Sequence, residues 1–309
     1  MSEVTARQLQ YFVAVIENGS VSTAALAQHL SQSALSMAIG QLETAVGSPL
    51  FVRSRAKKIQ PTPAALRLLP YARDVIETLD VVKDVVRDDH LVKRGVLRVG
   101  CLPTLSPRIL PGLVEAMGRE HPQIELVTVE ESPVELQDKL RAGQLDVAFM
   151  YRRLVEAEMA RHDLAPATIH IMMPMTHPKA GASSARLEDV IDLPLILLDI
   201  PPTGDAILGI VLGLGFEPEP VLRSTNIETI REYVARGLGY CLTNTVPDHS
   251  YSFCAGQVAY VPLENPIPQN AITAVTVGDR IPSARVEVAI DILSAQLASS
   301  ATGENREQS

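Results

Sequence analysis

The sequence predicts an α/β fold in three parts: a winged helix-turn-helix over residues 1–62, a linker with a dimerisation helix over 63–94, and a two-lobed α/β domain over 95–300. Two short helical patterns followed by a basic loop predict the first part, and a heptad repeat of apolar residues predicts the second. Alternating strand and helix patterns predict the third. Residues 301–309 are expected to form a disordered tail.

The first helical pattern follows Ser22, a plausible N-cap, and its residues 24–30 are mostly small and apolar. Small residues let a second helix cross close to the first. Ser31 or Gln32 breaks the pattern, so the sequence predicts two helices joined by a tight polar turn.

The second helix is expected to begin at Ser33 or Ala34 and to stop at Gly47 and Pro49. Its apolar residues recur at spacings of four, three and four, so they share one face: Leu35, Ile39, Leu42 and Val46. The opposite face is short, polar and uncharged, which lets it approach base edges, and its N-terminus favours phosphate. The candidate DNA-binding residues on these two helices are Ser22, Thr23, Gln32, Ser33, Ser36, Met37 and Gly40.

A strand pattern at 50–53 leads into a loop with four cations: Arg53, Arg55, Lys57 and Lys58. A charge run as short as this one is usually a solvated turn. Its position one strand after a helix-turn-helix favours a wing that binds DNA phosphates. These four cations therefore join the candidate DNA-binding residues.

Residues 7–62 resemble the LysR-type transcriptional regulators of bacteria, also called LTTRs. The resemblance rests on the motifs at 7–13, 19–20, 24–25, 31–36, 39, 42–43, 47, 50–53 and 61–62. Together these motifs are highly specific, whereas each alone is weak. The resemblance implies a sequence-specific DNA-binding transcriptional regulator.

The sequence departs from the family pattern on the face expected to read DNA. Ser33 stands where a proline is usual, and Met37 where a basic or polar residue is common. Ala38 stands where the family commonly has Gln, Gly40 where it has a basic residue, and Ala65 where a glycine is usual. Base contacts of better-known relatives therefore do not transfer to this chain. Met37 is instead a candidate for apolar contact with a thymine methyl group.

Thr62 and Pro63 open a long helix that is expected to run to about Arg87. From Ala65 on, its apolar residues recur at alternating spacings of three and four, which is a heptad seam. The seam predicts pairing of two chains, and the alternative is a helix packed on its own domain. A polar hinge is expected at 88–95. The residues expected at the dimer contact are Leu68, Ala72, Val75, Leu79, Val82 and Val86.

From residue 95 the predicted strands lie at 96–100, 124–129 and 145–150, with helices at 105–120 and 133–142 between them. This order predicts a parallel sheet with helices on both faces. A second unit of the same kind follows Ala165, and a last helix at 284–297 is expected to return to the first unit. Lobe I is expected at about 95–164 and 268–300, and lobe II at about 165–267.

The family resemblance continues in this part, through the motifs at 95–100, 110–111, 122, 143–148 and 234–239. It implies an effector domain that resembles type 2 periplasmic binding proteins and senses a small molecule between its lobes. It also implies that dimers pair into tetramers.

Ligands of such folds bind beyond the carboxyl ends of the strands. The residues that follow the predicted strands are therefore candidate effector-binding residues: Leu102, Pro103, Thr104, Leu105, Ser132, Tyr151, Pro202, Thr203, Thr225, Asn226 and Asn244. Each hydroxyl or amide can equally cap a helix or close a turn. Their convergence from both lobes favours a binding site, and Arg152 nearby permits a small carboxylate or an aromatic ligand.

The formal net charge of −9 is unusual for a DNA-binding protein. Residues 1–94 hold 11 Lys and Arg against 9 Asp and Glu, whereas residues 95–309 hold 16 against 27. An acidic body disfavours DNA contact outside the mildly basic N-terminal part. Neither a membrane-spanning apolar run nor a signal peptide is recognisable, so we expect a cytoplasmic protein with no membrane partner.

The three cysteines, Cys101, Cys241 and Cys254, are too scattered for a disulfide framework or a zinc site. A thiol-redox-sensing regulator remains an alternative, although Cys101 and Cys241 lie in apolar runs.

An enzyme is not expected, because no histidine has metal-ligand spacing or a nucleophile partner and no glycine loop binds phosphate. A solute-binding protein would not carry residues 1–62. We expect no catalytic residue, metal or cofactor. The expected partners are operator DNA, further copies of the chain in a homodimer or homotetramer, a small-molecule co-inducer of unknown identity, and RNA polymerase.

Overall fold

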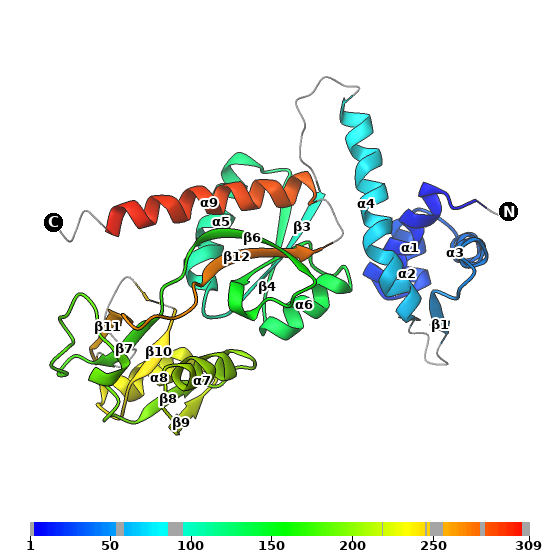
Figure 1. Cartoon of the computed structure of the whole chain (residues 1–309). Helices are drawn as coiled ribbons and strands as arrows, with labels where there is room; N and C mark the ends of the chain where they lie inside the picture. The colour runs from blue at the N-terminus through cyan, green and yellow to red at the C-terminus, as the bar shows by residue number, and fades with distance from the viewer. Residues whose placement is uncertain are drawn as a thin grey trace. The chain divides into compact units, whose positions relative to one another are not determined.

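The computed structural model describes residues 3–53, 59–85, 95–217, 219–244, 246–247, 256–278 and 282–304. They form two compact units with the main boundary between Val96 and Leu97. The first unit is mostly helical, and the second contains sheets flanked by helices (Figure 1). The structure confirms the predicted α/β class with an N-terminal winged helix-turn-helix. Among the described residues, no helix is long and apolar enough to span a membrane.

Three capped helices open the N-terminal unit: α1 (Ala6–Asn18), α2 (Val21–Ala27) and α3 (Gln32–Val46). The Ser20 hydroxyl accepts the N–H of Thr23 at the start of α2, and the Ser31 hydroxyl accepts the N–H of Ala34 at the start of α3. These contacts correct two predictions. Ser20 rather than Ser22 caps α2, and α3 begins at Gln32 rather than at Ser33 or Ala34.

An antiparallel hairpin follows, made of β1 (Phe51–Arg53) and β2 (Ile59–Pro61), and leads into α4 (Pro63–Val85). The Glu43 carboxylate near the end of α3 accepts the N–H groups of Leu50 and Phe51 at 2.7 and 3.2 Å, which ties α3 to the hairpin. The Thr62 hydroxyl accepts the N–H of Ala65 at the start of α4, as predicted.

Lobe I of the second unit contains one five-stranded sheet, in the order β4-β3-β5-β12-β6. Its strands are β3 (Gly95–Cys101), β4 (Ile124–Glu130), β5 (Val147–Tyr151), β6 (Met159–Pro166) and β12 (Ala271–Val277). β3 and β5 are parallel, but β12 runs antiparallel to both β5 and β6. The sheet is therefore mixed rather than purely parallel, because β12 enters it from lobe II.

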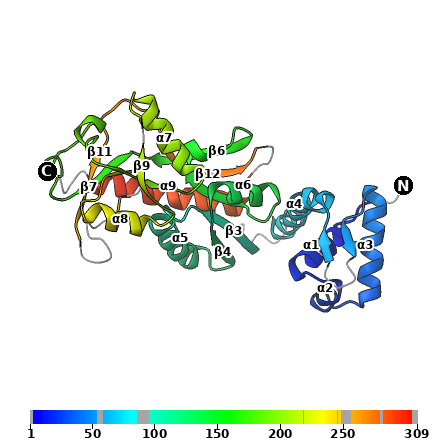
Figure 2. The same cartoon turned by 90° about the horizontal axis from the view of Figure 1, so that it is seen from below.

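Three α-helices belong to lobe I: α5 (Ser106–Glu120), α6 (Pro133–Arg141) and α9 (Ala284–Glu304). α5 and α9 pack against each other (Figures 1 and 2), and the Gln296 side chain of α9 donates a hydrogen bond to the Gly112 carbonyl of α5. α9 ends at Glu304, inside the segment that was expected to be a disordered tail from residue 301. Residues 305–309 lie outside the described residues.

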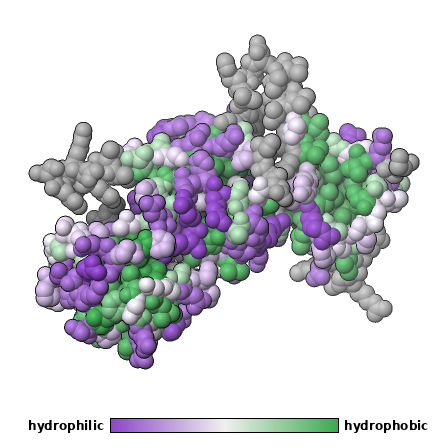
Figure 3. All heavy atoms as spheres, viewed as in Figure 1, coloured by the Kyte–Doolittle hydropathy of each residue, from purple (hydrophilic) through white to green (hydrophobic). Residues whose placement is uncertain are grey.

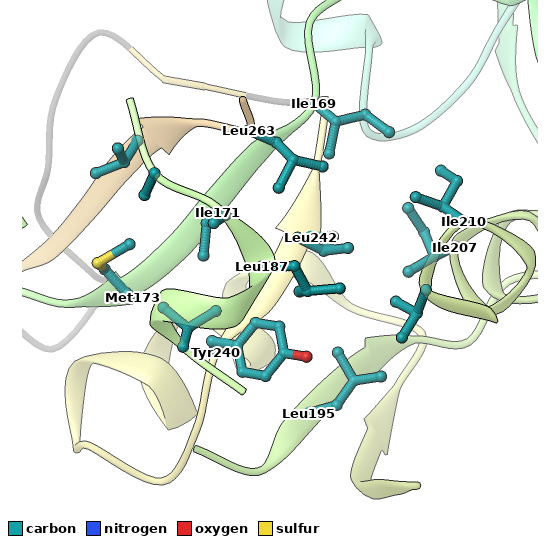
Figure 4. Packing of buried hydrophobic residues seen from close by; sticks show 14 of the residues in the cluster. Ile169, Ile171, Met173, Leu187, Leu195, Ile207, Ile210, Tyr240, Leu242 and Leu263 are labelled. Carbon is teal, nitrogen blue, oxygen red and sulfur yellow. The ribbon is translucent and has the colours of Figure 1, made fainter. Parts of the chain in front are cut away.

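Lobe II contains a three-stranded sheet and a two-stranded sheet, and a parallel bridge between Leu195 and Tyr240 joins them. Its elements are β7 (His170–Pro174), β8 (Leu195–Leu198), α7 (Thr203–Gly213), β9 (Pro220–Ser224), α8 (Ile227–Ala235), β10 (Cys241–Thr243) and β11 (Val258–Pro262). Tyr240 and Leu242 face Ile207 of α7 across the core of the lobe (Figure 4). The chain passes between the lobes twice, from β6 to β7 and from β11 to β12, and we call these two segments the crossovers.

Candidate functional site

The outer face of α3 is the candidate DNA-reading surface. Leu35, Ile39 and Leu42 are buried, whereas Met37 on the opposite face keeps 64% of its surface exposed. Gln32 and Ser33 are exposed, and Ser36 and Gly40 are half-buried. A Cβ added to Gly40 would meet nothing within 4 Å, so this face is open to an incoming duplex.

The other candidate DNA-binding residues lie on α2 and on the hairpin. Ser22 and Thr23 are exposed, and both hydroxyls contact the Ser20 cap, at 3.2 and 2.6 Å. Arg53 ends β1. Arg55, Lys57 and Lys58, the other cations of the predicted wing, lie outside the described residues.

The seam of α4 divides into two halves. Ala72 is 1% exposed, so it belongs to the interior of its own unit, and its assignment to a dimer contact is corrected. Leu68 packs against the same core but is only half-buried, so its place at a dimer contact stays a prediction. Val75 and Leu79 are 42% and 36% exposed, and hydrophobic surface gathers in this region of the unit (Figure 3). Val82 lies in the same helix, and Val86 lies outside the described residues.

Four effector candidates of lobe I follow β3, and two of them belong to the core. Leu102 and Leu105 are 4% and 1% exposed, so their side chains pack in the core of the lobe. Pro103 is exposed and Thr104 is half-buried. Beside them, the Ser106 hydroxyl donates to the Glu130 carboxylate, which joins the start of α5 to the end of β4.

The remaining lobe I candidates have structural partners. Ser132 caps α6: its hydroxyl donates to the Glu135 carboxylate at 2.7 Å and accepts the N–H of Glu135 at 3.4 Å. Tyr151 is 6% exposed at the end of β5.

In lobe II, the candidates lie where β8, β9 and β10 end. Pro202, which follows a cis peptide bond, and Thr203 are half-buried at the start of α7. Thr225 and Asn226 are exposed, and Asn226 caps α8 by accepting the N–H of Glu228 at 2.8 Å. Asn244 is half-buried and accepts a hydrogen bond from the side chain of Asn270 at 3.4 Å.

Arg152 does not offer the open cation that the sequence suggested. Its guanidinium forms a two-point ion pair with Asp163, which also accepts the Thr273 hydroxyl at 2.8 Å. A ligand carboxylate at this position would compete with a carboxylate that is already bound.

Beside this ion pair is a pocket of about 480 Å³ that sequence reasoning missed. Both crossovers line it, with Leu164, Ile169, Leu263 and Ile267 among its apolar residues and Asn270 among its polar ones. The two crossovers are separated by about a hundred residues of sequence, so no local pattern indicates that they meet.

The described cysteines are buried in different lobes. Burial raises the pKa of the Cys241 thiol to about 12. Burial, with a smaller contribution from the charge of Glu130, raises the pKa of Cys101 as well. A thiol with a raised pKa is a poor nucleophile, because the thiolate is the reactive form. Cys254 lies outside the described residues. Among the described residues, no group of three or more His, Cys, Asp or Glu side chains is arranged to hold a metal ion.

The chain matches two family models. Residues 6–66 match "Bacterial regulatory helix-turn-helix protein, lysR family", and residues 91–298 match "LysR substrate binding domain". The second match alone covers more than half of the chain.

Curated relatives match most of this chain in sequence. A probable hydrogen peroxide-inducible genes activator of Mycobacterium leprae is 31% identical over 76% of both chains. A hydrogen peroxide-inducible genes activator of Dickeya chrysanthemi is 28% identical over 87% of this chain and 88% of the relative. Among solved structures, a full-length OxyR variant from Pseudomonas aeruginosa superposes with a TM-score of 0.73, at 27% identity over 96% of this chain and 98% of that one.

The order of structural parts along the chain agrees with the two family models that it matches. An open helix face precedes a hairpin, a helix with an apolar strip follows, and the two lobes come last. The chain is a LysR-type transcriptional regulator: it belongs to the bacterial LysR family, whose members bind DNA and oligomerise.

Proposed function

We propose that this regulator binds its operator through the outer face of α3 and the β1–β2 hairpin, as a dimer or a pair of dimers. A small-molecule co-inducer held between the two lobes modulates operator binding or promoter activation, with RNA polymerase as a further partner. The chain acts in the cytoplasm, carries no cofactor and performs no catalysis.

The polar residues at the strand ends of both lobes are the observation that supports an effector site. Thr104 and Thr203 are half-buried where β3 and β8 lead into α5 and α7. Each lies near a helix N-terminus, where backbone N–H groups favour polar or anionic ligand groups. Because Asp163 holds Arg152, we infer that recognition rests on these hydroxyls and N–H groups rather than on a guanidinium.

A thermal-shift screen of metabolites on the full chain tests this proposal, since a ligand of the folded state must raise the melting temperature. The matched variants are Thr203→Val in the proposed site and Thr168→Val on a crossover, where Thr168 is exposed. We expect a hit whose shift is lost in Thr203→Val and retained in Thr168→Val. A hit that stabilises both variants equally contradicts this location.

Hydrogen peroxide sensing is a second candidate, because the curated relatives are named as peroxide-inducible activators. The buried thiols of Cys101 and Cys241 argue against direct oxidation of either one. We therefore expect peroxide to leave operator affinity unchanged in an electrophoretic mobility shift assay. A change that Cys254→Ser abolishes would establish the peroxide-sensing alternative through that residue.

A further inference from the structure

The DNA-reading part of this chain is almost free of positive charge. No Lys or Arg occurs in residues 8–52, which contain α2, α3 and nearly all of α1. DNA binding normally depends on cations that neutralise phosphates. In this stretch, His29 is the single side chain that becomes cationic near neutral pH.

His29 lies in the turn between α2 and α3, two residues before the Ser31 cap. Its backbone is left-handed, with φ of 54°, and its N–H donates to the Leu26 carbonyl at 3.1 Å. Histidine and asparagine tolerate this conformation better than most residues. The residue is exposed, so the imidazole reaches solvent at the start of the recognition helix.

Within the part of the chain that the structure describes, the charged side chains of the neighbouring helices form no ion pair with this imidazole. The titratable groups on the three helices are Arg7, Tyr11, Glu17 and Glu43. Glu17 pairs with Arg73 at 3.1 Å, and Glu43 accepts the N–H groups of the hairpin. The two carboxylates nearest in sequence are therefore engaged by other groups.

The recognition helix of a helix-turn-helix enters the major groove with its N-terminal residues first, so the turn before it lies beside the DNA backbone. A positive imidazole there would add to the field of the N–H groups at the start of α3. We propose that protonated His29 contacts a DNA phosphate and makes operator affinity depend on pH. This rests on the proposed docking of α3 against DNA.

The direction follows from linkage. A phosphate partner favours the charged form of an imidazole over its neutral form. Affinity for DNA should therefore be higher at a pH where the imidazole carries its proton, and this gain is lost as the pH rises and the proton leaves.

Fluorescence anisotropy with the full chain and the duplex upstream of its own coding region tests the proposal, in salt series at pH 6.0 and pH 8.0. Each added phosphate contact steepens the plot of log affinity against log salt by about 0.9, which is about fivefold in affinity per protomer at 0.15 M salt. We expect this steepening at pH 6.0 in the wild type.

His29→Asn keeps a residue suited to the left-handed backbone and should abolish the pH effect. His29→Lys should give the steep slope at both pH values. His162→Asn, at an exposed histidine of the second unit, serves as the control and should retain the wild-type response. An unchanged pH effect in His29→Asn overturns the proposal, as does a wild type that binds specifically with equal slopes at both pH values. Loss of specific binding by the wild type at both pH values would instead refute the docking of α3.

Discussion

Replacing Val75 and Leu79 by glutamate should separate dimerisation from folding. Both side chains lie in α4, where they are 42% and 36% exposed in the single chain, so a charge at either position reaches water in the monomer. In a dimer whose partner covers the exposed part of the α4 seam, the same charges would be buried without partners, which is costly in free energy. We expect Val75→Glu/Leu79→Glu to fold normally and to dimerise much more weakly than the wild type.

The exposed fractions set the size of the effect. Full burial of a valine or leucine contributes about 1.5–3 kcal/mol, so covering the exposed part of each side chain contributes about 0.5–1 kcal/mol. Four such side chains in a dimer contribute about 2–4 kcal/mol. Since 1.4 kcal/mol is tenfold in affinity, their loss should weaken the dimer by about 30-fold to several hundredfold.

Sedimentation velocity over a concentration series measures this change directly, and far-UV circular dichroism checks the fold. Ala72→Glu provides the contrasting variant, because Ala72 is 1% exposed inside its own unit and a buried charge there should destabilise the fold itself. If the double variant dimerises as tightly as the wild type, this strip of α4 is not the dimer contact.

Three further variants and treatments test other parts of the account. Met37→Ala should relax the preference for thymine at one operator position, and binding of every operator variant as in the wild type would exclude that role. Burial raises the pKa of Cys241 to about 12 and also raises the pKa of Cys101. A disulfide reagent at pH 8.0 should therefore leave both thiols unmodified until the protein unfolds. Fast labelling of either thiol in the native protein would contradict this. Tyr260→Phe removes the acceptor of a 2.7 Å hydrogen bond from the buried Arg231, so thermal unfolding should show a loss of about 1–3 kcal/mol, and an unchanged midpoint would show that the bond contributes nothing.

The N-terminal unit is the part that sequence patterns predict best. The buried face of α3 follows from the spacing of Leu35, Ile39 and Leu42, because one stripe of a helix must pack. Cap positions were less accurate, since Ser20 and Ser22 are both suited to cap α2 and only the local backbone decides between them. The seam of α4 is equally regular where it packs on its own unit and where it is exposed, so periodicity could not separate Ala72 from Val75.

The second unit depends more on contacts between distant residues. β12 is almost entirely buried, so it lacks the alternation that marks a strand, and its direction is set by the return of the chain from lobe II. The pairing of Arg152 with Asp163, and of Asp163 with Thr273, spans 11 and 110 residues. A candidate such as Leu102 was placed correctly after its strand, but burial of its side chain depends on packing that one sequence does not reveal.

The most direct test of the central claim is the operator specificity of the full chain. Fluorescence anisotropy at 0.15 M salt should compare the duplex upstream of its own coding region with a scrambled duplex of the same composition. A DNA-reading regulator should prefer its operator by about a thousandfold or more. Equal affinity for the two duplexes would contradict the assignment of α3 and the hairpin as a sequence-specific DNA-binding surface.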